Sequence, residues 1–490
     1  MSATDWGLLA QVLLGATLMV LLLADAFLPE GGKRWLAPIA GVGLLGVLLA
    51  LLSAAGSGLD APGVNHLLYN KTVSVDSFAV FFQVLFVGLA LMVLLLAPSY
   101  LERRGIQRGE FYILLVAALG GMMLMVAATS LMTIFLGIEL LSISLYILSA
   151  FLRQEERSQE AGLKYLLIGG FATGFLLYGM ALLFGGTGST SLSDIAAKLP
   201  NLDGDGRLYS LSGIALILVG VAFKASAAPF HAWTPDVYEG APAPVVAFMS
   251  VGTKVAAIAI FLRIFVVDLA RAYPRWVLLL GAIAGLSMIV GAVGALRQTN
   301  LKRMLAYSGI AHAGYLMLAV VAQKAGMVAG LFYLAAYGVM TFGAFGIVTL
   351  LATRDGERSR IDDIRGLGFR RPALGALLAL FMLSLAGIPP TVGFAGKLFV
   401  FQAAIRAGYI PLAVIGVLSS AVSLYYYLRV VIALYTPPED STAAEVESAV
   451  RPRRTDPFGT AAVALAGVLT LALGVFPSVL YELAQKASLL

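Results

Sequence analysis

The chain has 490 residues, of which 60% are hydrophobic and only 12% are charged, a composition that excludes a soluble globular domain. The absence of cysteine excludes thiolate-bound iron–sulfur clusters, and three histidines argue against a multi-haem protein. The net charge of +6 does not indicate nucleic-acid binding, because in a membrane protein the distribution of Lys and Arg carries more information than their sum.

Apolar runs of about twenty residues recur along the chain, each long enough to cross a hydrocarbon core of roughly 30 Å as a helix. We therefore predict an all-α polytopic membrane protein with about fourteen transmembrane helices. The predicted spans, numbered 1 to 14, cover residues 6–28, 35–54, 75–98, 111–129, 131–151, 161–184, 210–233, 243–267, 277–297, 302–322, 326–352, 372–402, 409–435 and 457–482. Three longer connections, 185–209, 353–371 and 436–456, are rich in Gly, Ser, Pro and charge, as solvated loops should be.

The distribution of basic residues predicts the orientation. Nineteen Lys and Arg residues lie in or beside the odd-numbered connections, which join spans 1 and 2, 3 and 4, and so on. Only eight lie in or beside the even-numbered connections and the termini. By the positive-inside rule the odd-numbered connections face the cytoplasm, and both termini lie on the periplasmic side.

Spans 7 and 12 are interrupted by proline near the middle, at Pro229 and at Pro389 and Pro390. Each has a lysine beside the break, Lys224 in span 7 and Lys397 in span 12. Because the two spans lie five apart, they cross the membrane in opposite directions, which is typical of inverted repeats with functional sites at the broken helices.

This pattern predicts two inverted five-helix repeats with discontinuous helices 7 and 12. The first repeat would be spans 4 to 8, residues 111–267, and the second spans 9 to 13, residues 277–435. Residues 1–98, with spans 1 to 3, and residues 457–490, with span 14, would flank them.

Basic side chains inside the predicted spans need an explanation. Lys224, Lys254 and Lys397 lie deepest, where each costs about 2.5 to 3.5 kcal/mol on insertion scales. A static ion-pair network that holds the bundle together is one interpretation. Arg263 and Arg429 lie near span ends, and we interpret them as side chains that reach the membrane interface.

A proton relay is the other interpretation of the deep charges. Desolvation disfavours the charged form of a buried lysine and a nearby carboxylate favours it, so a lysine whose carboxylate approaches and withdraws can bind and release a proton. Glu139, near the middle of span 5, would pair with Lys224, and Lys254 and Lys397 would be further stations.

Three further residues fit this relay less specifically. Lys164 lies close to the predicted cytoplasmic end of span 6. There it would either take up protons or anchor the helix at the membrane interface. His231 and His312 suit a relay because imidazole titrates near neutrality, although a histidine in a bundle is often only a hydrogen-bonded packing residue.

The stretch Phe230-His-Ala-Trp-Thr-Pro-Asp-Val-Tyr-Glu-Gly-Ala-Pro242, with Lys224 before it, closely resembles the N-subunit family of respiratory complex I, the NADH:quinone oxidoreductase. This family belongs to the antiporter-like membrane subunits related to Mrp cation/proton antiporters. The resemblance implies that Glu139 and Lys224 form the proton-input pair, that Lys254 connects to Lys397, and that Lys164 contributes.

The resemblance also implies a function: a bacterial inner-membrane subunit that moves protons from cytoplasm to periplasm, coupled to quinone reduction elsewhere in the complex. This chain would hold no cofactor or metal, and NADH, FMN, iron–sulfur clusters and quinone would be bound by partner subunits. Its partners would be other membrane subunits, including adjacent antiporter-like subunits, and lipids. Two alternatives stay open, a subunit of an Mrp-type antiporter and a structural subunit whose lysines are inert.

Overall fold

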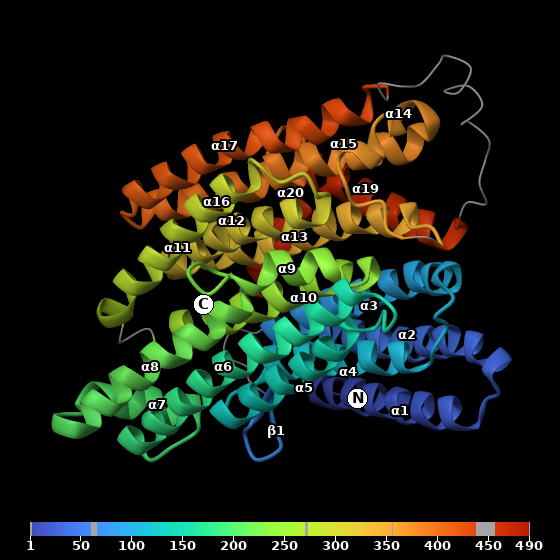
Figure 1. Cartoon of the computed structure of the whole chain (residues 1–490). Helices are drawn as coiled ribbons and strands as arrows, with labels where there is room; N and C mark the ends of the chain where they lie inside the picture. Colours follow the sequence, from blue (N-terminus) through green and yellow to red (C-terminus); the bar gives the residue numbers. More distant parts are fainter. Residues whose placement is uncertain (1, 60–65, 270–272, 355, 438–455, 490) are drawn as a thin grey trace.

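The computed structural model describes residues 2–59, 66–269, 273–354, 356–437 and 456–489. Within them the fold is a bundle of roughly parallel and antiparallel helices with one short β-hairpin (Figure 1). Thirteen of the described helices are long and apolar enough to cross a membrane. A shorter apolar helix, Pro372–Ala386, is followed after a break by Val392–Arg406, and with this broken pair the structure agrees with the prediction of about fourteen spans. Most of the predicted connection 436–456 lies outside the described residues.

The N-terminal helices pack at one side of the bundle (Figure 1). A capping box at Ser2 and Asp5 starts the first helix, and the side chain of Asp76 caps α3. A two-stranded antiparallel hairpin precedes α3. The elements are α1 (Ala3–Phe27), η1 (Glu30–Trp35), α2 (Leu36–Gly56), β1 (His66–Leu68), β2 (Val73–Val75) and α3 (Ser77–Arg104).

The next group contains the first broken helix. Predicted span 7, residues 210–233, is in the structure a longer helix that ends at Lys224 and a separate short helix that begins at Trp233. The elements are α4 (Glu110–Ala127), α5 (Leu131–Ser149), α6 (Glu156–Thr187), α7 (Leu192–Lys198), η2 (Leu199–Asn201), α8 (Gly204–Lys224), α9 (Trp233–Gly240), α10 (Ala243–Phe261) and the π-helix η3 (Leu262–Asp268).

The last group contains the second broken helix, formed by α15 and α16. Predicted span 14, residues 457–482, is divided before Pro477, because proline cannot continue a helix without losing a backbone hydrogen bond. The elements are α11 (Tyr273–Ala295), α12 (Leu301–Val321), α13 (Lys324–Leu351), η5 (Asp362–Ile364), α14 (Leu367–Arg370), α15 (Pro372–Ala386), α16 (Val392–Arg406), α17 (Ile410–Leu434), α19 (Pro457–Val475) and α20 (Pro477–Lys486).

The centre of the bundle is formed by α10, α12 and α13, which lie between the N-terminal and C-terminal helices (Figure 1). In their apolar windows 100%, 94% and 94% of the residues are buried, whereas only 22% are buried in α1. The central helices are therefore surrounded by protein, and the outer helices present apolar faces outward.

The connections alternate between the two ends of the bundle. At one end the odd-numbered connections meet through ion pairs that join Arg104 to Glu155, Arg303 to Asp236, and Lys302 to Glu357. At the other end Thr129 donates a hydrogen bond to the carbonyl of Lys71, and the N–H of Leu131 donates to the carbonyl of Thr190. Alternation of this kind is what fourteen antiparallel crossings require.

Arg263 is not a side chain that extends outward from the bundle, because it is buried and has a partner inside the protein. Its side chain belongs to η3 and is 6% exposed, and its guanidinium donates to both carboxylate oxygens of Asp76 at 2.9 Å. Arg429 also has intramolecular partners, the carbonyls of Leu296 and Gln298 just beyond the end of α11. Arg263 thus pairs with a buried carboxylate, and Arg429 donates hydrogen bonds to carbonyl groups beyond a helix end.

Replacing Asp76 with asparagine is expected to lower the free energy of unfolding by about 3 to 5 kcal/mol, because the buried Arg263 then loses the carboxylate with which it forms an ion pair. The loss is measured as a lower melting temperature in detergent. Glu30→Gln is the control, because Glu30 is 83% exposed and its pair with Lys33 contributes little. Adding Arg263→Met to Asp76→Asn should restore much of the lost stability, and a double variant no better than Asp76→Asn contradicts this explanation.

Candidate functional site

The first helix break exposes a lysine to the interior of the bundle. Helix α8 ends at Lys224, and the next helix begins at Trp233, because Pro229 lacks the N–H group that a continuing helix needs. Across the break, the indole N–H of Trp233 donates to the carbonyl of Phe223 at 3.2 Å. The Lys224 side chain is buried, with 2% exposure.

Lys224 contacts hydroxyl groups on α5. Its ammonium donates to Oγ of Ser142 at 2.6 Å and to the hydroxyl of Tyr146 at 3.5 Å. Glu139 lies one turn before Ser142 and accepts a hydrogen bond from the hydroxyl of Thr173 at 2.8 Å. No ion pair between Glu139 and Lys224 is present among the contacts of the described residues. One turn of α5 therefore separates the carboxylate from the hydroxyl that Lys224 contacts.

Lys254 lies at the centre of the bundle on α10. Its ammonium donates to the hydroxyl of Tyr238 on α9 at 2.8 Å, and it lies 4.9 Å from the centre of the Tyr238 ring. The side chain also lies against α12: a methyl group at Gly309 would be 3.1 Å from Cε and 3.2 Å from Nζ of Lys254. Glycine at this position leaves room for the lysine.

One face of α12 continues from Lys254 toward the second break. His312 follows Gly309 by one turn, and its ring nitrogens contact the hydroxyls of Tyr333 at 2.7 Å and Tyr427 at 3.2 Å. Tyr315 follows by another turn, and the centre of its ring lies 5.2 Å from Nζ of Lys397. This row of residues lies between the two lysines.

Lys397 reaches back to the helix end that the second break leaves open. Helix α15 ends at Ala386, where Gly387 adopts φ +89°, and α16 begins at Val392 after Pro389 and Pro390. The ammonium of Lys397 donates to the carbonyl of Ala386 at 2.9 Å and to the hydroxyl of Ser420 at 2.8 Å. The second buried lysine beside a break thus also has only uncharged partners among the described residues.

Lys164 lies in a polar cleft at the end where the odd-numbered connections meet. Its ammonium pairs with Glu160 at 2.6 Å and with Asp236 at 2.9 Å, and Asp236 also pairs with Arg303 at 2.6 Å. Burial raises the pKa of the Asp236 carboxyl, but the hydrogen bonds from Lys164 and Arg303 outweigh this effect and hold the pKa below its usual value. The cleft, about 210 Å³ in volume, is lined by Arg157, Glu160, Lys164, Asp236, Glu239 and Arg303.

His231 is not connected to the row of α12 residues that lies between Lys254 and Lys397. It lies half-buried in the first break, and no contact of the described residues connects its ring to a buried lysine. Within the described residues, no group of three or more His, Asp and Glu could hold a metal ion.

Several partners of the buried lysines and of His312 are absent from the sequence prediction: Ser142, Tyr238 and Ser420 contact lysines, and Tyr333 and Tyr427 contact His312. One of them had a signal in the sequence, since Glu139 and Ser142 are spaced to share a helix face. The others lie on neighbouring helices, 16 to 115 residues away in the chain from the residues that they contact, and no local spacing pattern identifies them.

The family described as NADH:quinone oxidoreductase/Mrp antiporter, TM, matches residues 128–423, which is more than half of the chain. NADH-quinone oxidoreductase subunit N of Trichlorobacter lovleyi is 43% identical over 486 residues, which cover 98% of this chain and 96% of the relative. Its counterpart in Chloroflexus aggregans is 40% identical and covers 99% and 97%.

Two solved structures have similar folds. A chain of respiratory complex I from Thermus thermophilus with bound aureothin has a TM-score of 0.79 and 35% identity, and the match covers 96% of this chain and 98% of that one. A chain of the Mrp complex from Dietzia sp. has a TM-score of 0.85 and covers 99% and 96%. Its identity is only 22%, so this second likeness concerns the fold alone.

Proposed function

Because the chain belongs to the NADH:quinone oxidoreductase/Mrp antiporter family, we infer that it is a proton-translocating membrane subunit of NADH:quinone oxidoreductase, complex I. Its curated relatives are named subunit N and match it over almost their whole length. Its partners are other membrane subunits of that complex. The Mrp alternative has less support, because the Mrp likeness is one of fold.

The proposed relay mechanism is supported mainly by the chemical nature of the groups that contact the three deep lysines. Lys224, Lys254 and Lys397 each contact hydroxyl or carbonyl oxygens, and none pairs with a carboxylate among the described residues. A static ion-pair network would give each of them a counter-charge. An unpaired buried ammonium is costly, and release of its proton removes that cost. This pattern favours proton exchange over a purely structural role.

We propose a path that follows the order of the contacts. A proton from the cleft around Lys164 and Asp236 reaches Glu139 and Lys224 at the first break. It then passes to Lys254, along the His312 face of α12, and to Lys397. His231, which lies apart from this row, is left out of the path.

The proposed direction is from cytoplasm to periplasm across a bacterial inner membrane. The excess of Lys and Arg at the end that holds the Lys164 cleft supports a cytoplasmic location for that end, with both termini on the periplasmic side. Quinone reduction in the complex would drive the path by changing the coupling between Glu139 and Lys224.

We further propose that residues 111–267 and 277–435 are inverted repeats, flanked by residues 1–98 and 457–490. Two features support this division. Each proposed repeat contains one broken helix, α8 with α9 and α15 with α16, and each break has a buried lysine beside it. The chemistry of NADH, FMN, iron–sulfur clusters and quinone is assigned to partner subunits.

Replacing Lys254 with methionine tests the proposed function, because methionine fills a similar volume but cannot carry a proton. Proton pumping, measured by dye quenching in inverted membrane vesicles, is expected to fall about 100-fold for each assembled complex. Lys324→Met is the control, since Lys324 is exposed at the start of α13. Unchanged pumping in Lys254→Met, at normal assembly, contradicts the relay.

A further inference from the structure

Glu357 is a nearly buried charge that the proposed relay does not use. It lies in the connection between α13 and α14, and its side chain is 11% exposed. One carboxylate oxygen accepts hydrogen bonds from the Tyr100 hydroxyl at 2.5 Å and from the N–H of Ala243 at 2.7 Å. The other accepts from the ammonium of Lys302 at 2.5 Å. Three donors from three helices therefore fix this carboxylate.

The backbone next to Glu357 is also fixed. Residues 359–361 run antiparallel to residues 299–301, immediately before and at the start of α12. The N–H of Leu301 donates to the carbonyl of Ser359 at 2.6 Å, and the N–H of Ile361 donates to the carbonyl of Thr299 at 2.9 Å. Glu357 thus reaches its partners from a segment that is anchored to α12.

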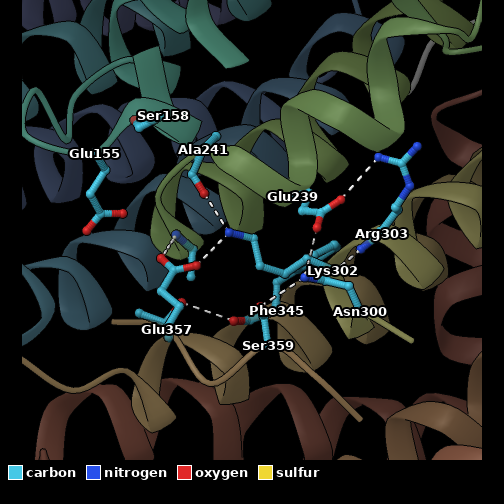
Figure 2. A network of polar contacts seen from close by, with 12 residues as sticks. Glu155, Ser158, Glu239, Ala241, Asn300, Lys302, Arg303, Phe345, Glu357 and Ser359 are labelled. Atoms are coloured by element: carbon cyan, nitrogen blue, oxygen red, sulfur yellow. Dashed lines mark hydrogen bonds and ion pairs between the residues drawn. The ribbon is translucent and has the colours of Figure 1, made fainter. Parts of the chain in front are cut away.

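The ion pair between Lys302 and Glu357 has partners on both sides of the corner between α9 and α10. Ala243 is the first residue of α10, so Glu357 binds one of the N–H groups that have no partner inside the helix. Lys302 donates its second hydrogen bond to the carbonyl of Ala241 at 2.7 Å, before Pro242. Figure 2 shows Lys302 between the Ala241 carbonyl and the Glu357 carboxylate.

The next residue on α12 holds the other helix of the corner. The guanidinium of Arg303 donates to Asp236 at 2.6 Å and to Glu239 at 3.1 Å, both on α9 (Figure 2 shows the second contact). Lys302 therefore holds the connection between α9 and α10 directly, and the start of α10 through Glu357, while Arg303 holds α9 itself.

This corner determines where Lys254, a station of the proposed relay, meets its hydrogen-bond partner Tyr238. Tyr238 lies on α9 and Lys254 lies on α10, and their hydrogen bond of 2.8 Å joins the two sides of the corner. Helix α10 is buried along its whole length, so displacement of its first turn is transmitted to Lys254 through close packing. A displacement of about 1 Å is enough to break a hydrogen bond.

We propose that Glu357 is a positioning residue of the proton relay. Through Lys302 and the first N–H of α10, it holds Lys254 within hydrogen-bonding distance of Tyr238. This role rests on the proposed function, in which Lys254 exchanges protons. A residue that only stabilised the fold would change the amount of assembled complex and leave the turnover of each complex unaltered.

The test combines two substitutions in the whole complex. Glu357→Gln keeps the side-chain length and an acceptor for the Ala243 N–H, but it leaves Lys302 without a counter-charge. We expect NADH oxidation by quinone, per assembled complex on a native gel, to fall about tenfold, as for one lost hydrogen bond to a charged group. Tyr238→Phe, which removes the acceptor of Lys254, should cause a similar loss.

The double variant Tyr238→Phe with Glu357→Gln should be no slower than the slower single variant, because both substitutions act through one hydrogen bond. A multiplicative loss, or full turnover in Glu357→Gln, overturns the positioning role. Asp362→Asn is the matched control, because Asp362 lies in the same connection and is 61% exposed in its pair with Arg365. It should leave turnover unchanged.

Two possible outcomes require an additional variant or comparison. If Glu357→Gln does not assemble, Lys302→Met combined with Glu357→Gln leaves no unpaired charge and is compared with Tyr238→Phe in the same way. If Lys254→Met pumps normally, the proposed function fails whatever Glu357→Gln does. If Lys254→Met stops pumping while Glu357→Gln turns over normally, only the positioning role fails.

Discussion

Replacing Lys224 with alanine is expected to lower the rate of NADH oxidation by quinone about 100-fold or more for each assembled complex. Lys224 is the proposed first station inside the membrane, and it contacts Ser142 and Tyr146 on the helix that carries Glu139. Without its ammonium, no described basic group takes its place at the end of α8, and the proton path stops at the first break. Redox turnover slows with it if electron transfer and pumping are tightly coupled.

Two comparisons make this prediction specific. Lys198→Ala removes an exposed lysine that donates to the carbonyl of Thr187, and it should leave the rate unchanged. Ser142→Ala removes the closest partner of Lys224 and should reduce the rate less than Lys224→Ala does, about tenfold. A normal rate in Lys224→Ala, with normal assembly on a native gel, contradicts a role for Lys224 in proton transfer.

Replacing Lys397 with arginine is expected to be nearly as harmful as replacing it with alanine, and both should reduce the rate about 100-fold. Arginine preserves the positive charge and can donate to the Ala386 carbonyl and the Ser420 hydroxyl, the partners that Lys397 has now. A guanidinium cannot release its proton in a protein, so it cannot serve as a relay station.

Comparing the two substitutions distinguishes a role of Lys397 in proton exchange from a role that requires only its positive charge and hydrogen bonds. If Lys397 only completed the end of α15 by hydrogen bonding, Lys397→Arg would retain most of the activity and Lys397→Ala would not. Assembly of both variants is measured on a native gel, because arginine is larger than the lysine it replaces. Activity close to normal in Lys397→Arg would therefore refute the relay at this position.

The number of membrane spans and the two broken helices could be predicted from the sequence because they depend on local signals. Long apolar runs predict spanning helices, and Pro229 and Pro389 predict where those helices stop. Helix ends without such a signal were less well predicted: α8 begins at Gly204, whereas the predicted span begins at residue 210.

The partners of the charged residues could not be predicted, because they depend on contacts between distant segments. Arg263 is close to a predicted span end, yet it is held inside the protein by Asp76, which lies 187 residues away in the chain. Glu357, in a segment with the composition of a solvated loop, is almost buried by Tyr100 and Lys302. The charge of a residue was visible in the sequence, and its environment was not.

The three lysines of the proposed relay illustrate both cases. Their depth in the spans was visible, and the structure places Lys224, Lys254 and Lys397 in the interior. The predicted pairing of Glu139 with Lys224 depends on which side chain fills the space between two helices, and that space contains the Ser142 hydroxyl. The hydroxyl and phenol partners explain how each lysine can be buried without a carboxylate.

Proton translocation by the Lys397→Arg complex is the measurement that tests the relay most directly. Inverted membrane vesicles with equal amounts of assembled wild-type and variant complex would be supplied with NADH, and proton uptake would be followed by dye quenching. The relay predicts that the variant, which keeps the charge and loses proton exchange, shows about 1% of the wild-type uptake rate. Uptake at the wild-type rate would show that protons do not pass through Lys397.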